Sequence, residues 1–373
     1  MASKSNPLGG LMSQLISSSS IGVDIGYESI IITVIKMKGG EPMIDELIYV
    51  DTPPGAISEG IITDPLLLGS TIKSALQSHG IKNNRITLAV SGQSAIIRLI
   101  KLPKMDIKEL QSVMNEEAER YIPFNPEDIQ MDYQVVDDEL PPEEDGIPKM
   151  DVILVASQKE LINSYIQMAE ASKLELSAID VASFACIRAF EHTNLANRDD
   201  ESVAVVLVRS EVTDVNIIKD GVPKFSRSIM IGDTRFIENI VTYMNVDYQN
   251  AKELRNNLVI PAAGTAAGTT SNDLAFNAVN PTLLELATEV QRSIDFYAMQ
   301  TGTKVDRIVL TGVGATIGNI AEFISAKVGI PIELGSPIGF VKVNDDKYAV
   351  EEIEKIAPLL STSIGLAIRG VAR

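Results

Sequence analysis

The chain has 373 residues, of which 45% are hydrophobic and 22% charged, a composition typical of a soluble globular protein with room for two domains. Its 32 basic and 50 acidic residues give a net charge of −18, which argues against nucleic acid as a partner because phosphate backbones would be repelled. The single cysteine, Cys186, excludes an internal disulfide, and with only two histidines in the chain, zinc and Ser-His-Asp sites are poor candidates.

The first 20 residues are rich in serine and glycine, and we expect a flexible tail over residues 1–20. A short amphipathic helix is the alternative, because five apolar residues fall at helical spacing: Leu8, Leu11, Met12, Leu15 and Ile16. Such a helix would lack the basic face of membrane-binding helices. No apolar run in the chain reaches the roughly 18 residues that cross a bilayer, and the N-terminus has no long apolar core typical of a secretory signal, so we expect a cytoplasmic location.

A three-stranded pattern occurs twice in the sequence. Apolar and β-branched runs predict three consecutive strands at 21–26, 29–36 and 43–50. The same pattern predicts three more strands at 203–208, 213–218 and 225–230. A Lys-Asp-Gly-Val-Pro turn in the second set echoes a Lys-Gly-Gly-Glu-Pro turn in the first. The repetition predicts a duplicated α/β domain with a cleft between its two halves.

Other elements lie between and after these two meanders. Further strands are predicted at 86–90, 95–101, 131–136 and 152–156. Apolar residues at helical spacing predict amphipathic helices at 107–121 and 159–172. The acidic segment 137–148 and the Gly- and Ala-rich segment 261–268 are predicted to be loops. The C-terminal third is predicted to hold one strand at 307–310 and helices at 282–299, 317–328 and 350–368.

Two glycine-bearing turns are candidates for binding a phosphate group or a nucleotide. Asp24 and Gly26 follow the first strand, where a glycine lets backbone amides approach a phosphate and a carboxylate can hold Mg²⁺. The turn Gly312-Val313-Gly314-Ala315 lies between a strand and a helix, where amides and a helix N-terminus can face an anion. Each motif alone is weak, since such turns are common for purely structural reasons. Their combination says more, because both turns would face one cleft between the halves.

At these residues the chain resembles a known family. The stretches that carry the resemblance are Ile21-Gly22-Val23-Asp24-Ile25-Gly26, residues 116–124 (Glu-Glu-Ala-Glu-Arg-Tyr-Ile-Pro-Phe), 289–297 and 306–315, with 357–360 and 364–367 near the C-terminus. They are similar to the PilM family of type IV pilus assembly proteins, within the actin-like ATPase superfamily and related to the cell-division protein FtsA. The resemblance covers about residues 20–370, and residues 116–124 are its most specific part.

The resemblance implies a duplicated ribonuclease-H-like, actin-like fold with a small inserted subdomain. The expected bounds are 1–20 for the tail, 21–195 with 341–373 for the first domain, about 93–177 for the inserted subdomain, 196–340 for the second domain and about 232–300 for its helical subdomain. The last segment of the chain is thus expected to cross back to the first domain.

The resemblance also implies a cleft site for ATP or ADP with Mg²⁺. Asp24 would hold the metal, and the residues expected to border the nucleotide are Asp24, Gly26, Ser29, Ser210, Thr213, Gly312, Gly314 and Ala315. No residue is assigned a catalytic role. The site is expected to bind nucleotide weakly, or not at all.

Several departures from the family pattern weaken this site. Leu207 and Arg209 stand where the family usually has an acid and a glycine, and Leu207 cannot bind a metal. Tyr27 and Glu28 replace small hydroxyl residues, Ile31 stands where relatives often have a lysine, and Lys252 stands where an acid is typical. Hydrolysis needs a clamped Mg²⁺ and a positioned water, so weak or no hydrolysis is expected. Pairing of Arg209 with a phosphate would preserve binding.

Three functions remain as hypotheses. The first is a cytoplasmic scaffold for assembly of a type IV pilus or a related secretion system, peripheral to the inner membrane through its partner and in contact with other assembly components. The second is an active ATPase that drives pilus assembly. The third is a sugar kinase, which shares the fold but needs a catalytic Asp that the region of Leu207 lacks. Self-association is left open.

The resemblance implies a groove for the short N-terminal cytoplasmic tail of the membrane protein PilN. Its expected contacts are Glu117, Tyr121, Ile122 and Phe124, with acidic edges and an apolar, aromatic centre. Pro123 would fix the loop and reduce the cost of ordering it when the peptide docks. The alternative is that the apolar members of this set pack the end of the helix against its own sheet.

Overall fold

The computed structural model describes residues 19–91, 94–140, 146–195, 200–262 and 268–371. The predicted tail therefore lies outside the described residues, apart from its last two positions, and so does the alternative helix within it. Parts of the two predicted loops, 141–145 and 263–267, also lie outside them.

The first sheet contains the first meander and has the order β10-β6-β1-β2-β3-β16. Its strands are β1 (Ser19–Ile25), β2 (Ser29–Lys38), β3 (Glu41–Asp51), β6 (Arg85–Val90), β10 (Glu175–Val181) and β16 (Lys342–Val343). β2 is antiparallel to β1 and β3, while β6 is parallel to both β1 and β10. The first strand begins at Ser19, within the predicted tail, because Ser19 and Ser20 pair with Lys36 and Ile35 of β2.

The second sheet repeats this arrangement, with the order β13-β12-β11-β14-β15. Its strands are β11 (Ser202–Val208), β12 (Thr213–Lys219), β13 (Val222–Ile229), β14 (Arg307–Thr311) and β15 (Ile332–Leu334). Again an antiparallel meander is followed by strands that run parallel to its first member. The predicted duplicated α/β fold is confirmed.

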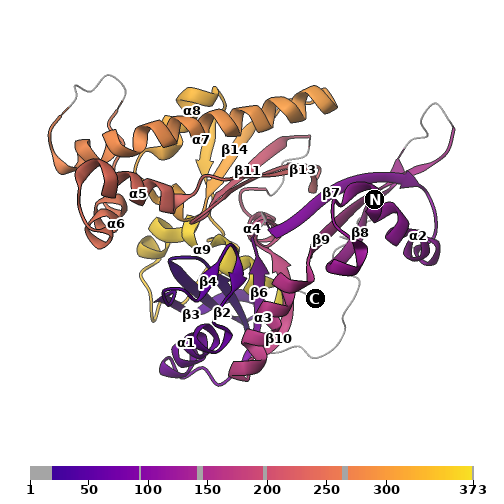
Figure 1. The fold of residues 1–373 in the computed structure, drawn as a ribbon, viewed down its shortest axis with the longest axis horizontal. Coiled ribbons are helices and arrows are strands. Elements are labelled where there is room, and N and C mark those ends of the chain that lie inside the picture. Colours follow the sequence, from indigo (N-terminus) through magenta and orange to yellow (C-terminus); the bar gives the residue numbers. More distant parts are fainter. Residues whose placement is uncertain (1–18, 92–93, 141–145, 196–199, 263–267, 372–373) are drawn as a thin grey trace.

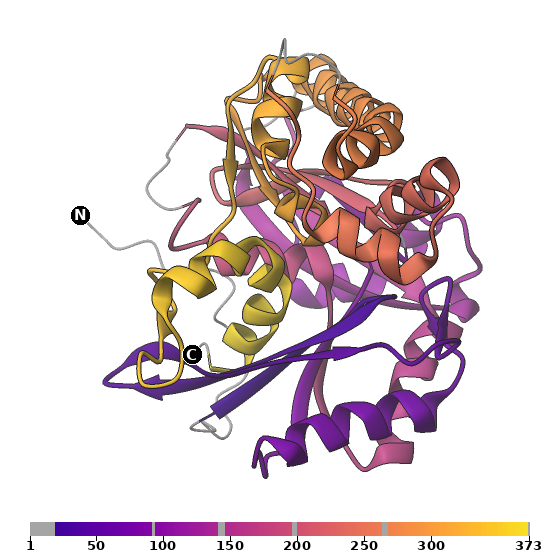
Figure 2. The same cartoon turned by 90° about the vertical axis from the view of Figure 1, so that its left-hand side faces the viewer.

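Helices cover the outer faces of both sheets and fill the layer between them (Figures 1 and 2). α1 (Pro65–Ser78) and α3 (Lys159–Ser172) pack on the outer face of the first sheet. Four helices pack on the outer face of the second: α5 (Asp233–Met244), α6 (Tyr248–Asn256), α7 (Ser271–Thr301) and α8 (Ile320–Val328). α4 (Ala182–Phe190) and α9 (Val350–Val371) lie between the two sheets.

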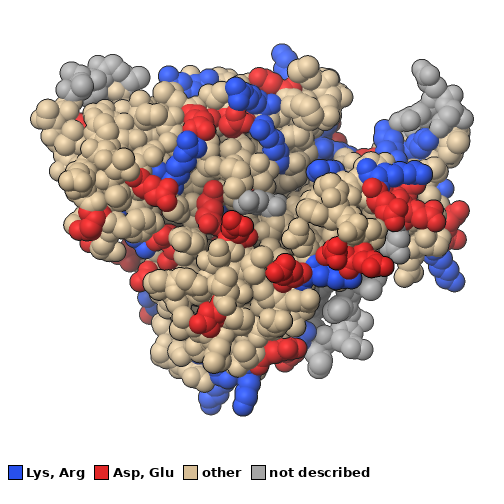
Figure 3. All heavy atoms as spheres, in the orientation of Figure 1, with Lys and Arg blue, Asp and Glu red and all other residues tan. Residues whose placement is uncertain are grey.

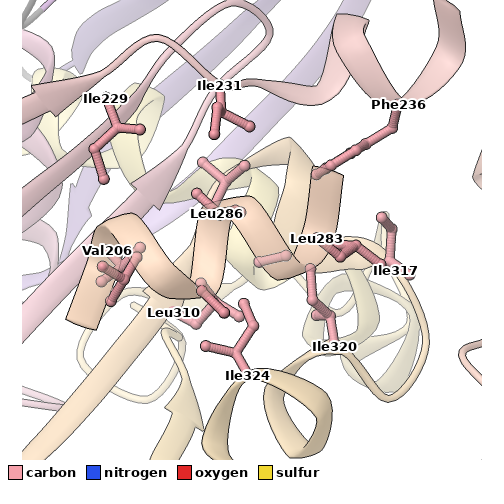
Figure 4. Packing of buried hydrophobic residues seen from close by; sticks show 14 of the residues in the cluster. Val206, Ile229, Ile231, Phe236, Leu283, Leu286, Leu310, Ile317, Ile320 and Ile324 are labelled. Carbon is pink, nitrogen blue, oxygen red and sulfur yellow. The ribbon is translucent and has the colours of Figure 1, made fainter. Parts of the chain in front are cut away.

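The side chains of β11 alternate between two hydrophobic cores, as expected for a strand buried on both faces. Val206 and Val208 belong to the outer core, where Figure 4 shows Val206 facing residues of α7 and α8. Leu207 points to the middle layer with α4 and α9 and is 1% exposed. Cys186 of α4 is fully buried in the same layer, which confirms that it is a small core residue.

A small subdomain projects from the first half (Figure 1). Its sheet has the order β7-β9-β8, built from β7 (Ala95–Pro103), β8 (Ile129–Leu140) and β9 (Lys149–Gln158), and α2 (Ile107–Tyr121) packs on it to form a separate core. The predicted bounds of 93–177 are too wide. They include α3, whose Leu161, Tyr165 and Met168 belong to the core of the first sheet.

Two predicted element bounds also differ from the structure. The predicted loop 137–148 begins too early, because β8 continues to Leu140 and pairs with the start of β9. The predicted helix 282–299 begins too late. α7 starts at Ser271, where Thr270 and Asp273 form a capping box, and it continues through Pro281.

In the part of the chain that the structure describes, no helix is long and apolar enough to cross a membrane. On the face shown in Figure 3, acidic and basic side chains are interspersed, and acidic ones gather on the projecting subdomain at the right.

The first half of the molecule consists of the first sheet, helices α1, α3, α4 and α9, and the subdomain. The second half consists of the second sheet and helices α5 to α8.

Candidate functional site

The candidate nucleotide residues lie after the ends of three buried strands. Asp24 is near the end of β1, Arg209 and Ser210 follow β11, and Gly312 follows β14. β11 and β14 are parallel and pair Leu207 with Thr311, so the segments that follow them are neighbours. The first of these segments belongs to the first half and the other two to the second half. Most of the residues predicted for the site are therefore brought together where the halves meet.

The turn after β1 is tight and lies against the second half. The amide of Gly26 donates to the carbonyl of Ser29 at 2.9 Å, which closes the β1–β2 turn. A Cβ atom at Gly26 would lie 2.9 Å from this carbonyl and 3.5 Å from Ser210 Oγ. A glycine is therefore favoured by the tight turn itself, since only the distance to the Ser29 carbonyl is too short for a Cβ atom. The amide expected to face a phosphate is already used within the turn.

Asp24 forms an ion pair across the two halves with Arg209. Arg209 Nη2 lies 2.7 Å from Asp24 Oδ1 and donates a second, longer bond of 3.2 Å to the carbonyl of Ile25. The side chains of Arg209 and Asp24 are only 12% and 15% exposed. Burial disfavours the charged form of Arg209 and would lower its pKa. The electrostatic effects of Asp24, Asp214 and Tyr165 outweigh burial, so the pKa of Arg209 is raised. The guanidinium is charged and forms an ion pair with the carboxylate that was expected to hold a metal.

Tyr165 of α3 is buried near this pair. Burial raises the pKa of Tyr165 to about 12, with Asp24 and Glu211 acting in the same direction and Arg209 against them. Its hydroxyl is therefore neutral at physiological pH.

The loop after β11 is held by the second half itself. The amide of Asp233 donates to the carbonyl of Arg209 at 2.9 Å, and the amide of Thr234 donates to the carbonyl of Ser210 at 2.8 Å. These are the first amides of α5, so this helix N-terminus is occupied by protein carbonyls. Thr213, predicted as a phosphate donor, is fully buried and donates its hydroxyl to the carbonyl of Ile231 at 2.7 Å. Its hydroxyl faces the interior of the second half.

The turn after β14 packs directly on β11. Gly312 has φ 90°, and a Cβ atom there would lie 2.3 Å from the carbonyl oxygen of Val208. Its amide donates to the carbonyl of Pro358 in α9 at 3.0 Å. Gly314 lies against the Val208 side chain, and Ala315 is 2% exposed. The glycines in this turn have a packing role that explains them without a ligand.

A buried arginine from α6 ties this turn to α5. Arg255 donates from Nε to Asp233 Oδ1 at 2.5 Å, from Nη1 to Thr316 Oγ1 at 2.9 Å and from Nη2 to the carbonyl of Val313 at 2.5 Å. It is 2% exposed. Burial raises the pKa of Asp233, and Arg255 partly offsets this shift. The sequence analysis missed this network; Arg255 follows the buried Ala251 by four residues, so helical periodicity could have placed it on the inner face.

A second polar contact links the halves at Glu28. Tyr248 Oη donates to Glu28 Oε1 at 2.6 Å, and Lys252 Nζ lies 3.2 Å from Glu28 Oε2. Burial and the bond to Glu28 raise the pKa of Tyr248. Burial alone would lower the pKa of Lys252. The hydrogen bond to Glu28 and the electrostatic effects of Tyr49 and Asp51 outweigh burial, so the pKa of Lys252 is raised. Glu28 and Lys252 are both departures from the family pattern, and their opposite charges were a signal that they pair.

The described residues do not fit Mg²⁺. A charged guanidinium is bound to Asp24, and Leu207, which stands in the place of the second acid, is buried in the apolar middle layer. Among the described residues, no group of three or more His, Cys, Asp or Glu side chains is placed to hold a metal ion. Ser29 contributes its carbonyl to the turn, and no contact of its side chain points to a ligand.

The predicted partner residues lie at the end of α2 on the projecting subdomain. Tyr121 and Phe124 are 36% and 43% exposed, whereas Ile122 is 4% exposed and packs in the core of the subdomain. Glu117 pairs with Arg120 at 2.7 Å. The alternative of core packing therefore holds for Ile122 but does not hold for the two aromatic side chains.

One of these aromatic residues, Phe124, lines a hollow of about 650 Å³. It is lined by the end of α2, the following loop and the start of α3: Ile122, Pro123, Phe124, Asn125, Glu127, Asp128, Gln158, Lys159 and Glu160. Lys159 donates from Nζ to the carbonyl of Glu127 at 2.7 Å, which joins the two sides of the hollow. Sequence reasoning found one wall of this hollow and missed the other, because 158–160 are distant in the chain.

Comparisons with known proteins agree with the fold. The profile of the family described as "Type IV pilus assembly protein PilM" matches residues 22–371. A solved structure of a "PilM-PilN type IV pilus biogenesis complex" is similar with a TM-score of 0.83 and 25% identity, covering 96% of this chain and 99% of that one. The ethanolamine utilization protein EutJ from Carboxydothermus hydrogenoformans is similar with a TM-score of 0.57 and 13% identity, covering 99% of this chain and 92% of that one, which shows a shared fold alone. Because the family profile matches nearly the whole sequence, the chain belongs to the PilM family of type IV pilus assembly proteins.

Proposed function

We propose that the protein is an actin-like scaffold for the assembly of a type IV pilus or a related secretion system, and that it binds the N-terminal cytoplasmic tail of a PilN-like inner-membrane protein. Binding would keep it at the inner membrane through this partner. The observation that carries the proposal is the exposed aromatic side chain of Phe124, which lines the hollow at the end of α2, together with the exposed Tyr121 three residues before it in the chain. The similar structure of a PilM–PilN complex supports the choice of partner.

The chemistry of the hollow suits a short peptide with apolar and basic residues. Tyr121 and Phe124 offer apolar surface that is desolvated when a ligand docks, and aromatic residues often dominate binding energy in such positions. Glu127, Asp128 and Glu160 line the same hollow and favour a cationic residue near the apolar contacts. Glu117 adds charge nearby, although Arg120 neutralises part of it.

The proposal is tested by calorimetric titration of a synthetic PilN-like tail peptide into the full chain. Phe124→Ala and Tyr121→Ala should each weaken binding by roughly tenfold or more, because an aromatic contact in such a site is worth about 1–2 kcal/mol or more. Both variants should melt at nearly the wild-type temperature, because the two side chains are largely outside the core. Full affinity in both folded variants would place the partner site elsewhere.

Ile107→Ala is the matched control for these variants. Ile107 is the first residue of α2 and is 76% exposed, so its loss removes an exposed apolar side chain from the same helix at the end away from the hollow. It should bind the peptide with wild-type affinity. Ile122→Ala should instead destabilise the subdomain, because Ile122 is a core residue.

We also propose that the chain hydrolyses ATP weakly or not at all. Arg209 on Asp24 and the buried Leu207 support this, because they leave no pair of carboxylates for a metal. Steady-state release of phosphate from Mg²⁺-ATP measures it directly. Robust Mg²⁺-dependent hydrolysis would favour the active ATPase, and phosphate transfer to a member of a sugar panel would favour the sugar kinase.

A further inference from the structure

We propose that Arg209 is a resident cation that stands in for the divalent metal at Asp24, and that it holds the two halves of the molecule together without a nucleotide. In this arrangement the connection is made by a side chain of the second half. It therefore cannot be released by hydrolysis or by exchange of a bound metal.

The geometry at Asp24 carries the inference. Arg209 Nη2 reaches both Asp24 Oδ1, at 2.7 Å, and the carbonyl of Ile25, at 3.2 Å, so one nitrogen contacts two oxygens at the end of β1. Hydrogen bonds between a guanidinium and a carboxylate are among the stronger ones in proteins. Both side chains are shielded from solvent. Salt screens a buried ion pair much less than an exposed one.

The backbone around Arg209 fixes its place. Its amide donates to the carbonyl of Val212 at 2.9 Å, and its own carbonyl accepts from the amide of Asp233. The first bond closes the loop between β11 and β12, and the second ties the loop to the start of α5. The Arg209 side chain extends from the second half toward β1. A Cβ atom on Gly26 would lie 3.5 Å from Ser210 Oγ, so the β1–β2 turn lies close to this loop.

Other polar contacts join the same two halves. Lys252 and Tyr248 of α6 hold Glu28 of the β1–β2 turn, close to Asp24 in the chain. Lys224 of β13 lies 3.0 Å from Asp151 of β9 in the subdomain. None of these contacts requires a nucleotide, and in each one the cation is supplied by the second half and the acid by the first.

The distance between the halves tests the inference in the full chain. Spin labels on Gln77→Cys, at the end of α1, and Gln249→Cys, in α6, place one exposed label on each half. Cys186 is fully buried and burial raises its pKa to about 12, so it should remain unlabelled. The label separation is then measured with no addition, with Mg²⁺-ADP and with Mg²⁺-ATP.

The wild-type separation should be single and narrow, and it should be unchanged by either nucleotide. Arg209→Ala should give a longer or broader distribution, and so should Asp24→Asn, which removes the charge but keeps the shape of the side chain. The second variant carries the test if the first does not fold. Arg188→Gln is the control, because it removes one arginine from a buried pair with Asp180 inside the first half, where Arg369 still contacts Asp180. This control should keep the wild-type separation.

Two results would overturn the inference. One is a wild-type separation that shortens or narrows when Mg²⁺-ADP or Mg²⁺-ATP is added. The other is a wild-type separation in both folded variants, Arg209→Ala and Asp24→Asn, which would show that the ion pair does not hold the halves together.

Discussion

At the scale of single residues, the departures from the family pattern are explained by the residues that they contact. Arg209 and Lys252 were recognisable as unusual from the sequence, and so was Glu28, but each was interpreted alone. In the fold, Arg209 meets Asp24 and Lys252 meets Glu28, and the members of these pairs are 185 and 224 positions apart in the sequence. Such contacts depend on how the two halves are docked, which local periodicity does not specify.

Arg255 gives a prediction at this scale. Replacing it with Met should lower the free energy of unfolding by about 3–5 kcal/mol, because the buried Asp233 would lose its partner while remaining shielded from water. Urea unfolding of the full chain measures the loss. The control is Arg235→Met, which removes an exposed pair with Glu285 and should change stability by less than about 1 kcal/mol. A loss as small in Arg255→Met as in the control would contradict a structural role for the network.

Asp180 gives a prediction about acid. Burial would raise its pKa, but Arg188 and Arg369 outweigh burial, and the pKa of Asp180 is lowered from 3.8. Because the folded pKa lies below the unfolded one, this group stabilises the fold above about pH 4 and the stabilisation is lost as the pH falls through the folded pKa. Asp180→Asn should therefore flatten the fall in unfolding free energy that occurs as the pH drops below about 5. If the free energy of unfolding of this variant depends on pH as it does in the wild type, Asp180 does not contribute to the acid sensitivity of the fold.

At the scale of elements, the sequence predicted strands more reliably than helix limits. The two meanders have long β-branched and apolar runs, and all six of their strands are present. Asp64 and Pro65 are helix-start signals for α1, yet no helix was predicted there. α3 was predicted correctly as a helix but assigned to the subdomain, because its periodicity shows that one face is buried and does not show against which sheet. For the same reason, the wall of the hollow that α3 supplies was not foreseen.

The start of α7 gives a prediction at this scale. Thr270→Ala should lower the free energy of unfolding by about 1 kcal/mol, because it removes the hydroxyl that accepts from the amide of Asp273 and closes the capping box. The control is Thr288→Ala, an exposed change within the same helix, where alanine has the higher helix propensity and no loss is expected. Equal stability of both variants by urea unfolding would show that the first turns of α7 do not depend on the cap.

At the scale of the whole molecule, the sequence predicted that the α/β domain is duplicated, but it did not predict how the two halves dock. The repeated meander predicted two related sheets, and their matching strand orders confirm it. The apolar layer between the sheets, formed by α4 and α9, joins strands from both halves and required the return of the C-terminal segment. The resemblance to a family supplied that return. What neither source supplied was the set of charged contacts that join the halves at Asp24, Glu28 and Asp151.

The central claim is that this chain acts as a scaffold whose partner binding does not depend on nucleotide. The most direct test is the affinity of the PilN-like tail peptide for the full chain, measured by calorimetry without nucleotide and then with saturating Mg²⁺-ATP. Because the halves are joined by side chains and the hollow lies between the subdomain and α3, within the first half, we predict the same dissociation constant under both conditions, within a factor of about two. Binding that appears only with Mg²⁺-ATP, or that tightens by tenfold or more when it is added, would contradict the claim.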